Sequence, residues 1–212
     1  YQSWMWKRHA GFDVVTYTGN ATDRYITHGL SKTPEMVWFM TRSQTSNNIV
    51  WHKDISPAQQ LVLNTSGDQE SGSWQFDSSL PFSSTHIGLT AGLTAINNNN
   101  STYLALLFAS VDGISKVGSF SGSNSDLSVN VGFQPRFLLI KGYTGANASY
   151  NWFVFDSLRG FGSGVDNKIY LNTNAAQDNS YDQGTFTSTG FTLEGNTNQN
   201  VSGTSFIYYA HA

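Results

Sequence analysis

The sequence has no cysteine and few charged residues. The lack of cysteine excludes disulfide bonds, thiol catalysis and cysteine-ligated zinc. Charged residues make up 12% of the chain, about half of the roughly 25% found in an average domain. A net charge of −3 argues against a protein that binds nucleic acid by neutralising phosphates. No apolar run approaches the roughly 20 residues of a membrane-spanning helix, so neither nucleic acid nor membrane insertion is expected.

Aromatic residues are abundant, at 14% of the chain, and they recur in short apolar runs rich in β-branched residues. Clusters of Gly, Asn, Ser, Thr and Asp separate these runs and favour turns. No stretch keeps a helical apolar period, although Ser56–Leu61 is expected to form a short helical turn. The pattern predicts an all-β fold of the sandwich or jelly-roll type. The expected strands lie at Phe12–Tyr17, Met36–Met40, Ile49–Trp51, Leu61–Leu63, Tyr103–Phe108, Phe137–Ile140, Trp152–Phe155, Phe191–Leu193 and Phe206–Tyr209.

An internal repeat organises the chain. VVTYTGNATD aligns with KVGSFSGSNSD, so that Tyr17 corresponds to Phe120. Further blocks follow in the same order: HGLSKTPEMVWFM with VGFQPRFLLIK, IVWHKDIS with FVFDSLRG, LVLNT with IYLNT, and YLALLFA with FIYYAHA. A period of about 100 residues is too long for a solenoid and suits two copies of a small β-domain.

The repeat predicts two tandem β-sandwich or jelly-roll-like units, at 11–111 and 112–212. Residues 1–10 are expected to be a linker or the end of a preceding domain, because the chain does not begin with Met. Whether the two repeats share one core is left open. Gly19 and Gly122 recur at turns and are expected to need a positive φ, which is a fold-maintaining role.

Catalytic motifs are weak, and the chain is not expected to be an enzyme. The five histidines do not recur between the repeats and show no metal-ligand spacing. The segment Gly160–Gly164 has the wrong spacing for a nucleophile elbow and is interpreted as an insertion loop of the second repeat. No cofactor is expected. A loose Ca²⁺ site at Asp166-Asn167 and Asp178-Asn179 is the remaining alternative.

Aromatic residues in the expected loops favour ligand binding over catalysis. Amide groups can hydrogen-bond sugar hydroxyls while an aromatic face packs on the ring. Trp38, Trp51 and Trp152 lie in expected strands and are assigned to the core or to a sheet face. Four loop aromatics are the candidate ligand-binding residues: Trp74, Tyr143, Tyr150 and Tyr181.

WKRHAGFDVVTYTGN at Trp6–Asn20, followed by the Gly-Leu and Pro turn of His28–Met36, resembles a duplicated, uncharacterised β-domain of tailed-phage virion proteins. These phages are chiefly marine and cyanobacterial. The second-copy signature of that family is matched by Val117–Gly122 and Gly132–Lys141. The chain departs from the family at Ala21, where Gly is usual, and at the end of Met36–Met40, where Lys is usual.

The resemblance implies a structural virion protein, in the exposed tail, that serves as a tail-fibre or receptor-binding module contacting host-surface glycans. Its implied partners are other virion proteins, further copies of itself as a homotrimer, and host-surface polysaccharide. The resemblance carries no catalytic residues. A capsid decoration protein on the capsid surface, a structural spacer without a ligand, and a glycan-cleaving depolymerase are the alternatives. A receptor-binding module predicts exposed aromatics around a pocket, whereas a spacer predicts aromatics buried between subunits.

Overall fold

The computed structural model describes residues 5–8, 10–71, 80–145, 150–162, 164–195 and 197–212. The chain divides into two compact units. The first comprises Tyr1–Gln60 and Glu70–Val111, and the second comprises Leu61–Gln69 and Asp112–Ala212. Of the expected positions, the Trp74 side chain lies outside the described residues.

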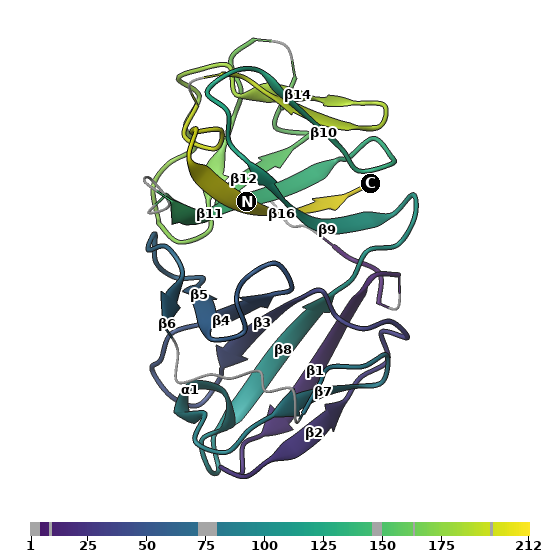
Figure 1. The fold of residues 1–212 in the computed structure, drawn as a ribbon, viewed down its shortest axis with the longest axis vertical. Coiled ribbons are helices and arrows are strands. Elements are labelled where there is room, and N and C mark those ends of the chain that lie inside the picture. The colour runs from purple at the N-terminus through teal and green to yellow at the C-terminus, as the bar shows by residue number, and fades with distance from the viewer. Residues whose placement is uncertain (1–4, 9, 72–79, 146–149, 163, 196) are drawn as a thin grey trace. The chain divides into compact units, whose positions relative to one another are not determined.

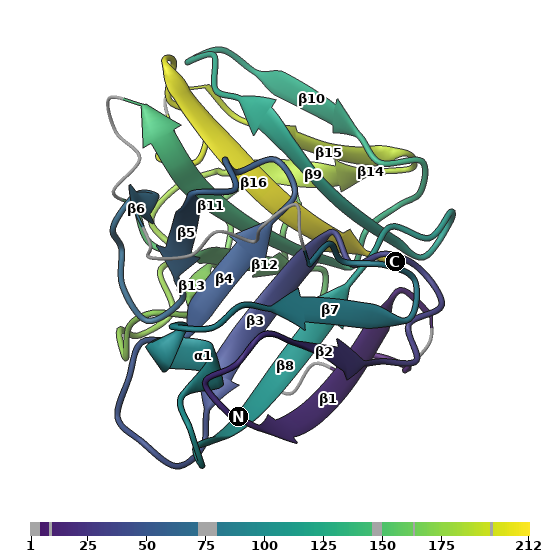
Figure 2. The same cartoon turned by 60° about the horizontal axis from the view of Figure 1, so that its bottom comes forward.

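A six-stranded antiparallel sheet carries the first unit, in the order β1-β8-β3-β4-β5-β6 (Figure 1). The strand β8, between β1 and β3, mostly alternates between half-buried and buried side chains, as expected of a strand with one face on a core. A separate pair, β2-β7, and the single-turn helix α1 complete the unit (Figure 2). The bounds are β1 Phe12–Thr18, β2 Arg24–Thr27, β3 Met36–Thr41, β4 Ile49–His52, β5 Gln59–Val62, β6 Glu70–Ser71, β7 His86–Leu89, α1 Thr94–Asn97 and β8 Thr102–Phe108.

The second unit has two antiparallel sheets, in the orders β13-β12-β11-β16-β9 and β10-β15-β14. The β11 strand carries a bulge between Gly142 and Thr144, where its pairing with β16 shifts. The bounds are β9 Ser115–Ser121, β10 Leu127–Asn130, β11 Phe137–Gly145, β12 Phe153–Asp156, β13 Ile169–Tyr170, β14 Gly184–Thr187, β15 Gly190–Leu193 and β16 Thr204–His211.

An aromatic core lies between these two sheets of the second unit. Phe191 of β15 meets Tyr208 of β16 with ring centroids 5.6 Å apart, and it meets Phe120 of β9 at 6.3 Å. Phe120 in turn stacks on Phe206 at 5.2 Å. Burying large aromatic side chains is the main stabilising contribution of such a core. The second unit is therefore sandwich-like.

The two main sheets have the same strand order. β1, β8, β3, β4 and β5 follow one another in the first as β9, β16, β11, β12 and β13 do in the second. The registers also agree at aligned positions: Tyr17 pairs with Tyr103, and Phe120 pairs with Phe206.

Gly19 and Gly122 correct one expectation from the sequence. Neither has a positive φ, and the positive φ lies two residues later, at Ala21 and Asn124. Both glycines are instead required by close approach, because a Cβ would collide with backbone atoms, including the carbonyl oxygen of Asn98 for Gly19.

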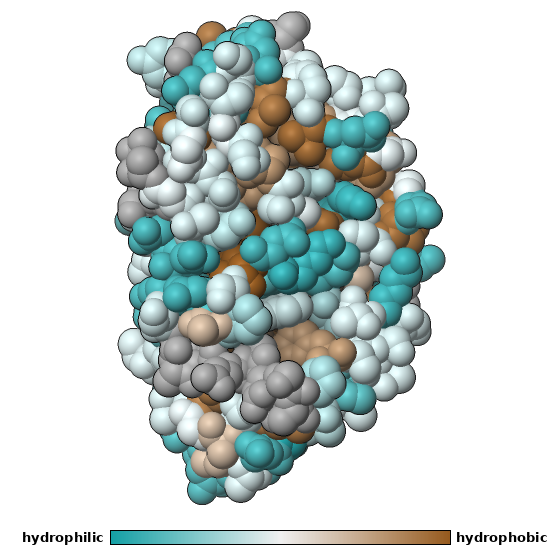
Figure 3. All heavy atoms as spheres, in the orientation of Figure 1, coloured by the Kyte–Doolittle hydropathy of each residue, from teal (hydrophilic) through white to brown (hydrophobic). Residues whose placement is uncertain are grey.

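The expectation of an all-β fold is confirmed, and each expected strand overlaps a strand of the structure. The helical turn expected at Ser56–Leu61 is wrong, because the chain turns at Pro57-Ala58 and continues as β5. Within the described parts of the chain, no helix is long and apolar enough to cross a membrane. The face drawn in Figure 3 is mostly pale to teal, in keeping with a surface of Ser, Thr, Asn and Gly.

Candidate functional site

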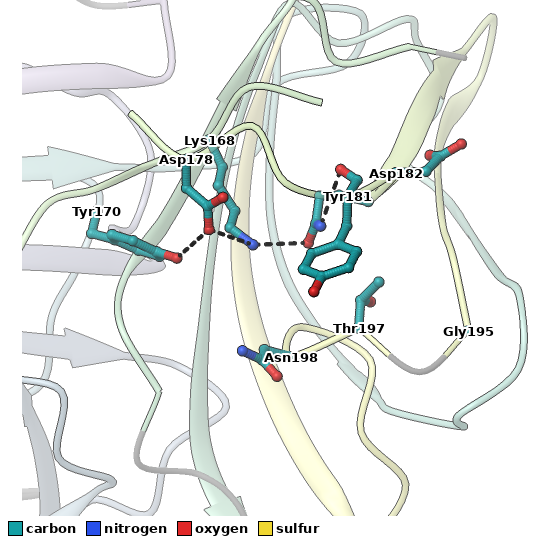
Figure 4. A pocket seen from close by; sticks show the side chains of 9 residues that line it. Lys168, Tyr170, Asp178, Tyr181, Asp182, Gly195, Thr197 and Asn198 are labelled. Carbon is teal, nitrogen blue, oxygen red and sulfur yellow. Dashed lines mark hydrogen bonds and ion pairs between the residues drawn. The ribbon is translucent and has the colours of Figure 1, made fainter. Parts of the chain in front are cut away.

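A pocket of about 310 Å³ lies in the second unit, between the loops that precede β14 and follow β15 (Figure 4). Most of its side chains are polar, and two are tyrosines. The lining residues are Lys168, Tyr170, Asp178, Tyr181, Asp182, Gln183, Gly195, Thr197 and Asn198.

Asp166 fixes the loops that build the pocket. Its carboxylate accepts backbone N–H hydrogen bonds from Gly162 at 2.8 Å, Gln183 at 2.6 Å and Gly184 at 3.0 Å. Its own N–H donates to the carbonyl oxygen of Tyr181 at 3.0 Å. Burial raises the pKa of Asp166, while the three N–H donors act in the opposite direction. The loop before β13 is thereby held against the loop that carries Tyr181.

Lys168, Asp178 and Tyr170 form a charged cluster along one side of the pocket. Lys168 Nζ lies 3.3 Å from Asp178 Oδ2, and the Tyr170 hydroxyl donates to the same oxygen at 3.1 Å (Figure 4). Hydrogen bonds from Ser180, together with the nearby Lys168, lower the pKa of Asp178 to about 2. Burial and the Asp178 charge raise the pKa of Tyr170 to about 12. At neutral pH Asp178 is therefore a carboxylate and Tyr170 a neutral phenol.

Two buried glutamines, Gln183 and Gln199, form a hydrogen-bond network with Lys168 of this cluster. Gln183 Oε1 accepts from Lys168 Nζ at 3.3 Å and from Gln199 Nε2 at 3.0 Å. Gln183 Nε2 donates to the carbonyl oxygen of Tyr181 at 3.3 Å. The network links the position of the buried ammonium to the backbone of the exposed tyrosine.

Tyr181 is the exposed aromatic residue of the site, with 71% of its surface accessible. Figure 4 shows its ring beside the same opening as the side chains of Thr197 and Asn198. The exposed face of the ring is available to pack against the apolar side of a ligand. The opening therefore combines an apolar face with hydrogen-bonding groups, which is the composition of a site for a polar ligand with apolar faces.

The structure separates the other aromatic residues that the sequence singled out. Tyr143 is half-buried in β11, where its carbonyl oxygen accepts from Gln69 N–H at 2.8 Å. Tyr150 is partly buried against the core, 6.3 Å from Phe153 between ring centroids. Neither lines the pocket, so only Tyr181 of the described candidates belongs to it.

The acidic residues named for calcium are engaged by the protein itself. Both oxygens of Asp166 accept backbone N–H groups, and Asp178 faces the Lys168 ammonium. Asn167 Oδ1 accepts from Gln177 at 2.8 Å. Within the described ranges, no group of three or more His, Asp or Glu side chains is arranged to hold a metal ion.

Trp51 of the first unit lies beside two shallower grooves, one of about 500 Å³ and one of about 270 Å³. Its ring meets Phe82 edge-on at 4.7 Å. Lys53 and Glu35 in the larger groove form an ion pair at 2.6 Å, and Glu35 also accepts from Ser110 N–H. This polar pair is satisfied by the protein, so the groove offers fewer groups to a ligand than the pocket around Tyr181.

Sequence reasoning missed Lys168 and Gln183. A lysine and a glutamine between strands are normally expected on the surface, and no local motif marks them. The extra length of the second repeat at Gly160–Gly164 was an indirect signal, because this loop does not line the pocket and is joined to it by hydrogen bonds from Gly162 N–H to Asp166 and from Gly164 N–H to Asp182.

Comparison with known proteins adds a family and no activity. No curated protein and no solved structure matches the chain. A family model described as a domain of unknown function, DUF7483, matches residues 5–212. The match covers nearly the whole sequence, and the chain therefore belongs to the DUF7483 family.

Proposed function

We propose that this chain is a non-catalytic structural module of a tailed-phage virion that binds host-surface glycans at the pocket around Tyr181. The observation that carries the binding proposal is the exposed Tyr181 ring beside a polar pocket. The phage context rests on the resemblance of Trp6–Asn20 and Gly132–Lys141 to tail-associated virion proteins.

The pocket suits a sugar because it offers both kinds of contact that a pyranose ring makes. The Tyr181 face can cover the C–H surface of the ring. Asn198, Asp182 and Lys168 supply amide, carboxylate and ammonium groups for hydroxyls. A volume of about 310 Å³ is at the small end of ligand pockets, which favours one or two sugar units of a longer chain.

Binding is favoured over cleavage by the state of the lining carboxylates. A glycosidase needs one protonated carboxylic acid as a general acid. Asp178 is ion-paired with Lys168, and its pKa is lowered to about 2, so it is deprotonated at neutral pH. Asp182 accepts N–H hydrogen bonds from Gly164 and Gly184, each at 3.2 Å. Both carboxylates therefore act in holding the loops.

The proposal includes a tandem duplication, with β-sandwich repeats at 11–111 and 112–212. Equal strand order and equal register support it. So does a matching pair of loop contacts: Asp23 accepts from Ala91 N–H at 2.6 Å, and Asp126 accepts from Gly195 N–H at 3.0 Å. The binding site then belongs to the second repeat alone, where the connection between β12 and β13 is longer than that between β4 and β5.

Assembly as a homotrimer in the tail is part of the same proposal, since tail appendages are symmetric oligomers. Light scattering of the purified chain would measure this directly. A mass of three chains supports an appendage module, and a stable monomer contradicts the homotrimer.

The experiment that tests the binding proposal is an array of bacterial-surface oligosaccharides and polysaccharides probed with the labelled chain. We expect binding by the wild type, loss of binding by Tyr181→Ala, and retained binding by Tyr25→Ala. Tyr25 is the matched control because it is an exposed tyrosine of the first unit that does not line the pocket. Equal loss in both variants, or release of reducing sugar from a bound glycan, contradicts the proposal.

A further inference from the structure

Lys168 has an N–H donor available to a ligand. Its side chain is only 7% exposed, yet it lines the pocket. An ammonium carries three N–H donors. Within the described part of the chain, two of them are used, by Asp178 Oδ2 and Gln183 Oε1, both at 3.3 Å. A buried donor without a partner is costly, so an oxygen atom of a bound ligand would complete the set.

The electrostatic surroundings of that donor are negative. Asp178 already balances the charge of Lys168, and Asp182 also lines the pocket. Two more carboxylates lie next to Gly195, which lines the pocket. Asp126 accepts the Gly195 N–H at 3.0 Å, and Glu194 precedes Gly195 in the chain. The charge of Asp126, followed by burial and by Asp182 and Asp166, raises the pKa of Glu194. These carboxylates repel one another, and together they carry more negative charge than Lys168 supplies positive charge.

From this arrangement we infer that the pocket takes an uncharged saccharide, with a hydroxyl oxygen accepting from Lys168 Nζ, and excludes sulfated, phosphorylated and uronic-acid glycans. The inference rests on the proposed function and names its ligand class. A hydroxyl can accept from Lys168 and donate to a carboxylate at the same time. A ligand anion gains little from an ammonium that Asp178 has neutralised, and it is repelled by Asp182 and Glu194.

The test uses pairs of oligosaccharides that share a backbone and differ only in sulfate or carboxylate groups, titrated against the wild-type chain. We expect the neutral member of each pair to bind at least about tenfold more tightly than the anionic member. The preference should shrink in the double variant Asp182→Asn, Glu194→Gln. It should persist in Asp112→Asn, which removes an exposed carboxylate that does not line the pocket.

A further variant tests the donor. Lys168→Gln should lose binding of the neutral probe, while Lys168→Arg should keep part of it; thermal melting of both variants checks that they fold. Tighter binding of anionic probes, with dependence on Tyr181 intact, overturns the inference and leaves the proposed function standing. Equal affinity within each pair also overturns it. Absence of any glycan binding overturns both.

Discussion

Asn97 and Asn200 make matching hydrogen bonds in their own units. Each side chain is fully buried. The side-chain oxygen of Asn97 accepts from Asn20 N–H at 3.2 Å, and that of Asn200 accepts from Ser123 N–H at 2.9 Å. Asn20 and Ser123 each follow one of the repeated glycines, so each buried amide holds a turn after the first strand of its unit.

Replacement of either amide should destabilise the protein. Asn97 Nδ2 donates to Thr22 O at 2.9 Å, and Asn200 Nδ2 donates to Ser125 O at 2.7 Å. Asn97→Ala and Asn200→Ala remove these hydrogen bonds to the backbone together with the packing of a fully buried amide, so each should lower the free energy of unfolding by about 2 kcal/mol. Asn99→Ala, at an exposed position, is the control. Urea denaturation measures all three, and a loss in the control as large as that in the variants contradicts this account.

Acid should destabilise the protein through His52. The ring is fully buried, Nδ1 accepts from Asp54 N–H at 3.1 Å, and Nε2 has no hydrogen-bond partner among the residues that the structure describes. Burial lowers the pKa of His52 from 6.5 to about 3. Between these values the unfolded chain binds a proton that the folded chain does not, so stability falls with falling pH by roughly 1.4 kcal/mol per unit for this group. Unfolding measured from pH 7 to pH 4 should show a shallower slope in His52→Phe than in the wild type. Equal slopes would exclude His52 as a source of acid sensitivity.

Lys141 should make the protein more stable as the pH rises into the alkaline range. Its side chain is buried, and Nζ donates to Gly142 O at 2.6 Å and to Ser66 O at 3.2 Å. Burial lowers the pKa of Lys141 from 10.5 to about 8. Between pH 8 and 10.5 the unfolded chain holds the extra proton, so this group makes stability rise with pH. The difference in stability between wild type and Lys141→Met should be constant below pH 8. Above pH 8 the wild type should gain stability relative to Lys141→Met. A stability difference that stays constant up to pH 10 contradicts the lowered pKa of Lys141.

The repeated glycines should not tolerate a side chain. Gly19→Ala and Gly122→Ala would place a Cβ against the backbone carbonyls of Asn98 and Val201. Each should cost about 2 kcal/mol or more, as overpacking does. Gly67→Ala is the control because its Cβ would make only an ordinary contact at 3.7 Å, and it should change stability by less than about 0.5 kcal/mol. Thermal melts of the three variants measure the difference.

The strands were predictable because each is marked by the types and spacing of its own residues. Runs such as Tyr103–Phe108 alternate in burial, and the aromatic and β-branched side chains that form them have no helical period. Shorter strands such as β13 and β14 carry too few residues to stand out from loops. The reason for Gly19 was predicted wrongly, because a sequence shows that a turn needs glycine but not whether dihedral angle or close approach demands it.

Of the residues that line the candidate site, the sequence predicted Tyr181 as a ligand-binding residue and named Asp178 for a different role, a loose Ca²⁺ site. An aromatic residue in a polar loop is visible in the sequence as an exposed ring. Two long-range contacts bring together Lys168, Asp178 and Gln183. One is the isolated β-bridge between Lys168 and Asp178, and the other is the set of three backbone N–H groups that Asp166 accepts. Such long-range pairings have no signature at the level of neighbouring residues.

The most direct test of the central claim is a crystal structure of the chain with an oligosaccharide that it binds. The account predicts a sugar ring packed on the Tyr181 face, with a hydroxyl within hydrogen-bonding distance of Lys168 Nζ. A sugar bound elsewhere, for example on Trp51, with the pocket around Tyr181 filled only by water, would contradict it.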